Sequence, residues 1–454
     1  MARRQLDKAQ VQDALLRILR SEGLRPAGEL PRRLNISHAT LSRIIKSLSD
    51  DIVIMGRGRA TFYALRRQIE GVPDLLPVFE VLPDGRSRRL GELRPLMHHS
   101  FALWSSNLES AQVFPDLPYF LDDARPAGFM GRLVPQRHPE MGLPEDIQMW
   151  SADMCLRYLC RHGWNLPGSL IVGDDAFRRY LEQAAAPADR VDIGTRKTMY
   201  PKMANDMLLL GAAGSSAAGE QPKFIATRYP DHVPVVVKFS PPTTSEVGER
   251  LADLLICEHL ALETIRAHGQ AAAISTLIQA DHRVFLEVER FDRTSDGGRR
   301  GLLSLHCLHA KFIGNITNWT AAVEALAKIK KVPQDCVDKV RWLEVYSKLI
   351  ANNDRHFGNI SFMANGLEIT ELAPAYDVLP MLFVPRGHQV IQQNFDPPLP
   401  STADATVWES ASAAACDFWQ RASTDTRISA GFRNLSAQCY EKVARSAEFA
   451  RRLP

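Results

Sequence analysis

The chain has 454 residues, enough for two or three domains, and its 45% hydrophobic and 24% charged residues are ordinary for a folded, soluble protein. No run approaches about 18 apolar residues, so a membrane span is not expected, and the first residues lack the apolar core of a signal peptide. The seven cysteines form no CxxC pair and are odd in number, which favours scattered thiols in a reducing compartment and predicts a cytoplasmic protein.

The net charge of +3 is unevenly distributed along the chain. Residues 1–67 hold 14 Lys and Arg against 6 Asp and Glu, an excess of +8, so the remaining residues carry −5. A basic head on a mildly acidic body indicates a separate module with an anionic partner.

Residues 1–68 are predicted to form three helices and a β-hairpin. Apolar residues from Val11 to Leu19 recur at helical spacing, and a short second helix covers residues 27–35. Ser37 can cap a third helix, and Ile52 and Ile54 then alternate in a strand that leads to a glycine turn with a basic tip. The inward positions of the second and third helices are Leu30, Leu34, Leu41, Ile44, Ile45 and Leu48.

This arrangement resembles a winged helix-turn-helix, in which the third helix enters the major groove of DNA. We therefore expect residues 1–68 to bind double-stranded DNA, through phosphate contacts and a few base contacts. A protein-binding module of the same size is the alternative. The expected DNA-binding residues are Ser37, His38, Ser42, Arg43, Lys46, Arg57 and Arg59.

Residues 69–200 are expected to have a structural role, because no pattern in them indicates a catalytic or binding site. A hairpin is predicted over residues 77–96, with its turn at Asp84 and Gly85, and a helix over residues 146–163. The expected core positions of that helix are Met149, Trp150, Met154, Leu156 and Leu159.

Residues 211–226 form a Gly-, Ala- and Ser-rich turn that leads into an extended segment. Small residues allow backbone N–H groups to approach a polyphosphate closely, although a flexible surface loop would have the same composition. It is not a Walker A loop, because Glu220 stands where the lysine should be. The next strand contains Lys238 among valines, and a buried lysine needs a partner or a task. Its candidate partners in the following helix are Glu246, Glu249 and Glu258.

The segment "LIANNDRHFGNISF" places polar residues inside an apolar run. Asp354 and Asn359 have the D-x-x-x-x-N spacing of a kinase catalytic loop, in which Asp accepts the hydroxyl proton and Asn holds Mg²⁺. Asp377 follows 18 residues later as a second acid for the metal. A carboxylate–His–Asn site for metal-dependent hydrolysis is the alternative, but it would leave Lys238 without a role.

Five segments, taken in order, resemble the HipA family of serine/threonine-protein kinases, which are toxins of bacterial toxin–antitoxin systems. The segments are "SSAAGEQPKF", "VVVKFS", "EVERFDR", "NDRHFGN" and "YDVLP". The resemblance covers about residues 75–450, and the basic head is similar to the fused winged-helix members of the YjjJ or HipH type. It implies an α+β fold with a winged helix (1–68), a β-rich kinase N-lobe (69–290) and a helical C-lobe (291–454).

The resemblance also implies roles for particular residues. Asp354 would be the general base, and Asn359 and Asp377 would hold Mg²⁺. Lys238 would contact the ATP phosphates, and Glu289, Arg290 and Phe291 would form the adenine hinge. The remaining nucleotide-binding positions would be Ala218, Gly219, Glu220, Gln221, Pro222, Lys223, His356, Phe357, Gly358 and Tyr376.

Two further expectations concern the glycine-rich loop. Ser216 matches the serine that these kinases autophosphorylate to inactivate themselves, and Ser215 beside it is a rival. The family commonly has Ala-Gln-Glu-Lys after the loop glycine, whereas this chain has Glu-Gln-Pro-Lys at residues 220–223. Pro222 therefore removes one backbone donor from the loop.

The predicted function is an ATP- and Mg²⁺-dependent protein kinase that inhibits growth, with its DNA-binding module in the same chain. The resemblance implies a protein substrate such as an aminoacyl-tRNA synthetase or another translation factor, although the residues themselves select none. Because DNA binding would lie in cis, the existence of a separate antitoxin stays open. The rival hypotheses are a transcription regulator with a nucleotide-sensing or inactive kinase body, a small-molecule kinase and a metal-dependent nuclease.

Overall fold

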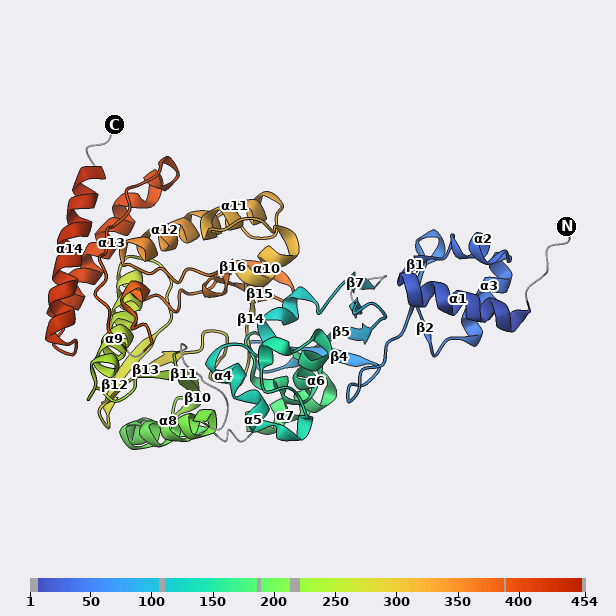
Figure 1. The fold of residues 1–454 in the computed structure, drawn as a ribbon, viewed down its shortest axis with the longest axis horizontal. Coiled ribbons are helices and arrows are strands. Elements are labelled where there is room, and N and C mark those ends of the chain that lie inside the picture. Colours follow the sequence, from blue (N-terminus) through green and yellow to red (C-terminus); the bar gives the residue numbers. More distant parts are fainter. Residues whose placement is uncertain (1–6, 106–110, 186–188, 213–220, 388, 451–454) are drawn as a thin grey trace.

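The computed structural model describes residues 7–105, 111–185, 189–212, 221–387 and 389–450. The molecule is elongated, with a helical head at one end and the C-terminal helix pair at the other (Figure 1). The head has three helices and a three-stranded antiparallel sheet of order β1-β3-β2, in which the three helices and the β2–β3 hairpin were predicted and the two-residue strand β1 was not. These elements are α1 (Lys8–Glu22), β1 (Arg25–Pro26), α2 (Leu30–Leu34), α3 (His38–Ser47), β2 (Ile52–Met55) and β3 (Phe62–Leu65).

The helices of the head bury the apolar positions that the sequence predicted. Leu15, Leu30, Leu41 and Ile44 belong to one buried cluster, and Leu48 is partly buried against it. Such a stripe is what makes each helix amphipathic, so the opposite face of α3 is left to solvent.

The hairpin of the head has buried residues on both of its faces. Ile52 is buried against the helices, whereas Ile54 on the same side of β2 is 51% exposed. On the opposite face, Val53 and Met55 are buried against Leu96 of the following sheet. Alternate residues of β2 therefore pack against the helices of the head on one side and against the next part of the chain on the other. A fragment of residues 1–68 would expose the face that carries Val53 and Met55.

The head is also joined to the next sheet by backbone pairing. The N–H of Met97 donates to the Leu65 carbonyl at 3.0 Å, and the N–H of Arg67 donates to the Pro95 carbonyl at 3.1 Å. Residue 68, the predicted boundary, thus lies beside paired backbone rather than in a free linker.

A second, five-stranded sheet of order β7-β6-β5-β4-β8 follows. The predicted hairpin is present, with its turn at Asp84 and Gly85 between β4 and β5. One predicted core position is wrong: Met149 is 70% exposed, because it lies in a 3-10 turn before α6 and not on the helix. The elements are β4 (Leu76–Val81), β5 (Ser87–Pro95), β6 (Phe101–Ser105), β7 (Gln112–Phe114), α4 (Gly128–Arg132), α5 (Val134–Arg137), α6 (Ala152–His162), β8 (Leu170–Val172) and α7 (Asp174–Ala185).

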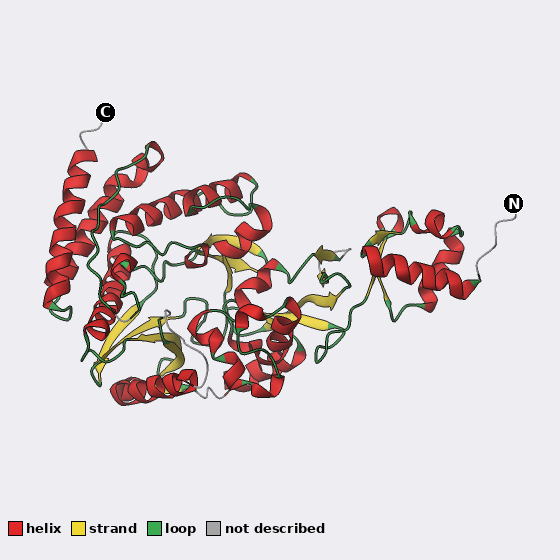
Figure 2. Ribbon diagram, viewed as in Figure 1, coloured by secondary structure: helices red, strands yellow, loops and turns green. Residues whose placement is uncertain are grey.

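A third sheet, of order β12-β13-β11-β10-β9, carries the nucleotide-binding segments expected from the sequence. Helix α8 covers one face through Tyr200 and Ala204, and α9 packs on the other. Residues 69–290 therefore contain two separate sheets, visible as two groups of yellow strands in Figure 2. The elements are β9 (Arg190–Asp192), α8 (Arg196–Ala212), β10 (Lys223–Tyr229), β11 (Val233–Phe239), α9 (Glu246–Ala267), β12 (Ser275–Ala280) and β13 (Arg283–Glu289).

The C-terminal part is mainly helical around a small sheet of order β14-β15-β16. Trp419 and Phe432 are fully buried and anchor the last two helices to the body. No disulfide joins any of the seven cysteines, all of which lie among the described residues. Within the described residues, no helix has the length and apolarity to cross a bilayer. The elements are β14 (Gly301–Ser304), α10 (Leu305–Phe312), α11 (Trp319–Lys328), α12 (Cys336–Leu349), β15 (Ser361–Asn365), β16 (Glu368–Leu372), α13 (Ala405–Thr424) and α14 (Ala430–Ala450).

Candidate active site

Two lysines stand opposite each other on the β10–β11 hairpin. The antiparallel register pairs Lys223 with Lys238, so both side chains leave the same face of the sheet. The neighbouring residues Phe224 and Val237 point to the other face, where they are buried in the cluster that includes α8. The strand alternation thus turns both ammonium groups toward the side of the sheet on which α9 lies.

Lys238 is only 6% exposed and is held by two carboxylates. Its Nζ donates to Oε1 and Oε2 of Glu258 on α9, at 2.6 and 2.8 Å, and to Oδ1 of Asp377. Of the three glutamates that the sequence left open, the structure selects Glu258, because Glu246 and Glu249 are exposed in the first turn of α9. A buried charge requires such pairing.

The two carboxylates differ in how firmly they hold a negative charge. Burial raises the pKa of Glu258, and the charge of Lys238 opposes this. Burial would also raise the pKa of Asp377, but the charges of Lys238 and Lys223 outweigh it and lower the pKa to about 2. The pKa of Lys238 is raised because both carboxylates together outweigh its burial. Asp377 is therefore ionised at neutral pH, in the form that Mg²⁺ requires.

The loop after α12 presents Asp354 to solvent. Oδ1 of the buried Asn352 accepts the Asp354 N–H at 3.1 Å, and Nδ2 of the buried Asn359 donates to the Asp354 carbonyl at 2.9 Å. These bonds fix the backbone on both sides of a side chain that is itself exposed. The carboxylate is therefore positioned by its backbone and accessible to a substrate hydroxyl.

Tyr376 ties the Asp377 segment to this loop. Its hydroxyl donates to the Gly358 carbonyl at 2.6 Å and lies 2.6 Å from Oγ of Ser361. Asp377 itself has φ of 53°, in the left-handed region that costs a non-glycine residue energy. The surrounding contacts maintain this conformation and aim the carboxylate at Lys238.

His356 and Phe357 shape the turn between Asp354 and Asn359, the two positions that the sequence predicts to be catalytic. Nδ1 of His356 accepts the Gly358 N–H at 3.0 Å, and its carbonyl accepts Nε1 of Trp319 at 3.1 Å. The Phe357 ring lies 4.4 Å from the ring of His309, between centroids. The exposed His356 ring keeps Nε2 for a ligand, whereas Phe357 has a packing role.

The backbone of the predicted adenine hinge is already hydrogen-bonded in part. The N–H of Glu289 donates to the Ile274 carbonyl at 2.8 Å, and the N–H of Arg290 donates to the Pro234 carbonyl at 2.9 Å. These two amides are therefore occupied by the sheet. Phe291 comes next, with its ring 5.8 Å from that of Tyr376, and it is the hinge residue that borders the Asp377 segment.

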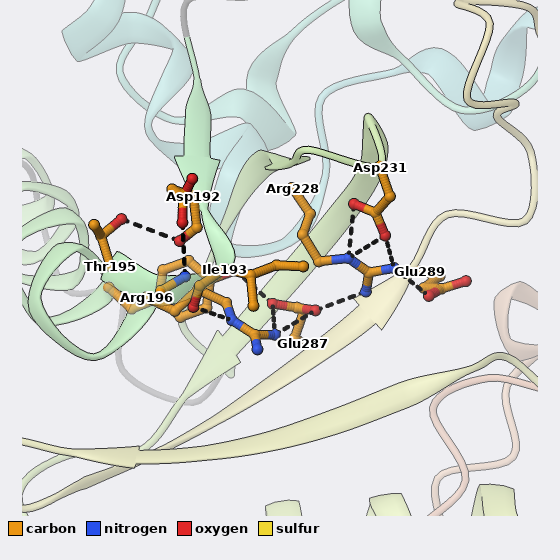
Figure 3. Close-up of polar contacts among 10 residues, drawn as sticks. Asp192, Ile193, Thr195, Arg196, Arg228, Asp231, Glu287 and Glu289 are labelled. Carbon is orange, nitrogen blue, oxygen red and sulfur yellow. Dashed lines mark hydrogen bonds and ion pairs between the residues drawn. The ribbon is translucent and has the colours of Figure 1, made fainter.

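The side chains of the hinge are engaged away from the lysines. Arg228 pairs with Glu289 at 2.8 Å (Figure 3), and the Arg290 guanidinium bonds Asp292 and Asn165. Any adenine contact of Glu289 and Arg290 would therefore be made by their carbonyl groups.

A buried polar network lies on the α8 side of this sheet (Figure 3). Glu287, which is 1% exposed, accepts from Arg196 at 3.1 Å, from Arg228 at 2.9 Å and from the Tyr200 hydroxyl at 2.6 Å. Arg196 begins α8, and the last two residues of this helix, 211 and 212, are the first two of the predicted glycine-rich turn. The network thus fixes the helix that leads into that loop, and the sequence analysis missed it.

Gln221 supplies the donor that Pro222 lacks. The N–H of Phe239 donates to the Pro222 carbonyl at 3.0 Å, and Nε2 of Gln221 donates to the Phe239 carbonyl at 2.6 Å. The departure from the family pattern is therefore compensated at the start of β10. The rest of the predicted loop lies outside the described residues, namely Ser215, Ser216, Ala218, Gly219 and Glu220.

Comparisons with known proteins agree with this architecture. A model of the HipA-like C-terminal domain matches residues 215–447, and a model of the YjjJ-like toxin middle domain matches residues 72–181. Among solved structures, HipA of Shewanella oneidensis MR-1, in a complex with HipB and operator DNA, is similar with a TM-score of 0.52. The identity is 14%, and the similarity covers 83% of this chain and 100% of that one, so it concerns the fold.

The chain belongs to the family of HipA-like toxins, which confirms the resemblance seen in the five sequence segments. Within this family it is 33% identical, over 441 residues, to Toxin YjjJ of Escherichia coli strain K12. That similarity spans 95% of this chain and 98% of the relative. Its fold is therefore that of a kinase-type toxin.

Proposed function

We propose that this protein is an ATP- and Mg²⁺-dependent serine/threonine-protein kinase of the HipA toxin type that acts in the cytoplasm. One observation carries the proposal: buried Lys238 is bound by Glu258 and Asp377 on the sheet face that also holds Lys223. A strand lysine paired with a helix glutamate is the arrangement by which kinases hold ATP phosphates.

The residues present fit this chemistry. Lys238 and Lys223 supply the positive charge for the phosphates, and Asp354 accepts the proton of the substrate hydroxyl. The amide oxygen of Asn359 and the ionised carboxylate of Asp377 are oxygen ligands of the kind that Mg²⁺ prefers. Bound Mg²⁺ would neutralise charge on the phosphates. The protein substrate, by family resemblance, is an aminoacyl-tRNA synthetase or another translation factor.

The function is tested by phosphopeptide mapping after incubation with Mg-ATP. We expect phosphate on Ser216, or on Ser215 in its place, with kinase activity declining as it accumulates. A phosphate there adds about −1.5 to −2 charges and would compete with ATP for Lys238. Ser216→Ala should stay active longer, Ser216→Asp should bind ATP poorly, and the exposed control Ser49→Ala should behave as wild type. Decay of activity without modification of residues 213–220 would exclude this regulation.

We also propose that the head binds duplex DNA. The seven predicted residues are all exposed, on α3 and at the hairpin tip. Oγ of Ser37 accepts the Thr40 N–H at 3.1 Å, so this hydroxyl caps α3 and is less available to DNA than the other six. The HipA relative from Shewanella was solved with HipB and operator DNA, whereas here the DNA-binding module would be part of the toxin chain.

The DNA proposal is tested by the salt dependence of the affinity for duplex DNA. The full chain is used, because one face of the hairpin of the head is buried against the next part of the chain. Arg57→Ala and Arg59→Ala should each reduce the slope of log affinity against log salt by about 0.9, the value for one phosphate contact. Arg43→Ala should relax sequence preference. Arg86→Ala, in an exposed turn of the second sheet, is the control and should leave the slope unchanged. Salt-independent binding, or none, would favour the protein-binding alternative.

A further inference from the structure

A histidine–carboxylate cluster lies in the middle domain, outside the kinase site. Nδ1 of His138 is 3.4 Å from Oε1 of Glu140, and Nε2 of His162 is 3.5 Å from the same oxygen. The three ligand atoms all lie within 4.8 Å of one another. His138 precedes the 3-10 turn Pro139–Met141 after α5, Glu140 lies within that turn, and His162 is the last residue of α6.

The spacing fits a tetrahedral ion. Nitrogen and oxygen ligands bind Zn²⁺ at about 2.0–2.2 Å, so the ligand atoms around a tetrahedral ion lie roughly 3.3–3.5 Å apart. The two distances to Oε1 of Glu140, 3.4 and 3.5 Å, agree with that geometry, and the third pair of ligand atoms lies within 4.8 Å. In addition, the end of α6 carries the negative pole of the helix, which favours a cation.

Solvent reaches the cluster from one side only: the His162 side chain is 7% exposed and that of His138 26%. The Glu140 carboxylate is 59% exposed, so the cluster opens to solvent on one side and leaves room for a water as fourth ligand.

Arg179 is the group that opposes a metal. Its Nη1 lies 3.0 Å from Nδ1 of His162, and a guanidinium can only donate, so this contact places the ring proton on Nε2. Metal binding through Nε2 requires that proton to move to Nδ1 and Arg179 to withdraw. Arg179 is exposed, so it can turn into solvent without leaving a buried charge.

We propose that His138, Glu140 and His162 bind a divalent first-row transition ion, with Zn²⁺ as the best fit. Two imidazoles and one carboxylate suit Zn²⁺ and its neighbours, whereas Mg²⁺ prefers an all-oxygen site such as that of Asp377. The ion would join the segment after α5 to the end of α6. This site is independent of the proposed kinase activity.

The test is Zn²⁺ titration of the full chain by calorimetry, after chelator treatment and in excess Mg²⁺ to occupy the kinase site. Wild type should bind one Zn²⁺ at this cluster, and His162→Ala should weaken the affinity by roughly 100-fold or more, beyond the loss seen for outer-shell partners. Glu140→Gln should weaken it at least tenfold, whereas its exposed neighbour Glu145→Gln should not. Zn²⁺ should also raise the melting temperature of wild type but not of Glu140→Gln.

Arg179→Gln separates the two interpretations of the cluster. It removes a positive charge and the competing donor, so it should bind Zn²⁺ several-fold more tightly than wild type. If the cluster is only a hydrogen-bonded chain from Arg179 through His162 to Glu140, wild type will bind no Zn²⁺ in excess Mg²⁺. That result, or a Zn²⁺ affinity unchanged in Glu140→Gln, overturns the proposal even if His162→Ala fails to fold.

Discussion

Replacing Asp354 with Asn should reduce phosphoryl transfer by roughly two to four orders of magnitude, the usual contribution of a general base. The amide keeps the shape of the side chain but cannot accept the hydroxyl proton. Folding should be unaffected, because the Asp354 side chain is exposed and its structural bonds are made by its backbone N–H and carbonyl. Binding of Mg-ATP should also persist, because Lys238 and Asp377 are retained.

The measurement is mass spectrometry of the chain after incubation with Mg-ATP, with ATP affinity measured in parallel. Asp296→Asn is a matched control, since Asp296 is an exposed aspartate in the turn after β13, and it should transfer phosphate as wild type does. If Asp354→Asn remains fully active, Asp354 is not the base. If wild type itself transfers nothing while binding Mg-ATP, the regulator with an inactive kinase body becomes the better hypothesis.

The segments that carry the candidate site residues could be recognised in the sequence, because each of them has its own local pattern. Lys238 stood out as a charge inside a valine strand, and Asp354 and Asn359 as polar residues inside an apolar run. These patterns arise because the apolar residues around the polar ones are buried, and such a pattern can be recognised within a single segment of the sequence. The structure places Lys238 and Asp377 in contact and joins the Asp354 loop to the Asp377 segment through Tyr376.

The partner of Lys238 could not be chosen from the sequence for a physical reason. Helix α9 is buried on several sides, from Ala252 to Ile265, so its apolar residues mark no single face. Because no single apolar face marks the side of α9 that packs on the sheet, the positions of Glu249 and Glu258 around the helix do not show which of them points toward Lys238. Only the packing of α9 on β13 and β12 decides this.

Contacts between distant segments were beyond the sequence patterns altogether. Glu287 and Arg196 are 91 residues apart, and the local sequence around one residue does not predict its contact with the other. The same holds for Val53 and Met55, which are buried by a sheet that belongs to the next part of the chain. The metal-ligand cluster had one local sign, His138 and Glu140 flanking a proline, but its third member lies on another helix.

Replacing Lys238 with Met should destabilise the chain by about 3–5 kcal/mol, the usual cost of leaving a buried charge without its partner. Glu258 is 2% exposed and would lose its cation. The measurement is urea unfolding followed by tryptophan fluorescence, with Lys238→Met and wild type compared at pH 7. The double variant Lys238→Met/Glu258→Met removes the lysine and the carboxylate that is 2% exposed, and it should recover most of the loss, because an apolar pair of similar volume often replaces a buried ion pair at little cost. Asp377, the second carboxylate bound to Lys238, is 36% exposed and keeps the nearby charge of Lys223.

The pH dependence of that loss identifies Glu258 as its source. Burial raises the pKa of Glu258 above its usual value of 4.5, and without Lys238 nothing opposes this effect as strongly. The folded variant then binds a proton that the unfolded chain releases near pH 4.5, so its stability is greatest below that pH and falls as the pH rises through the raised value. The gap between Lys238→Met and wild type should therefore be small near pH 4 and widen toward pH 7. A gap that is equally large at both pH values, or that remains in the double variant, would show that lost packing of the lysine chain and not the stranded carboxylate causes the destabilisation.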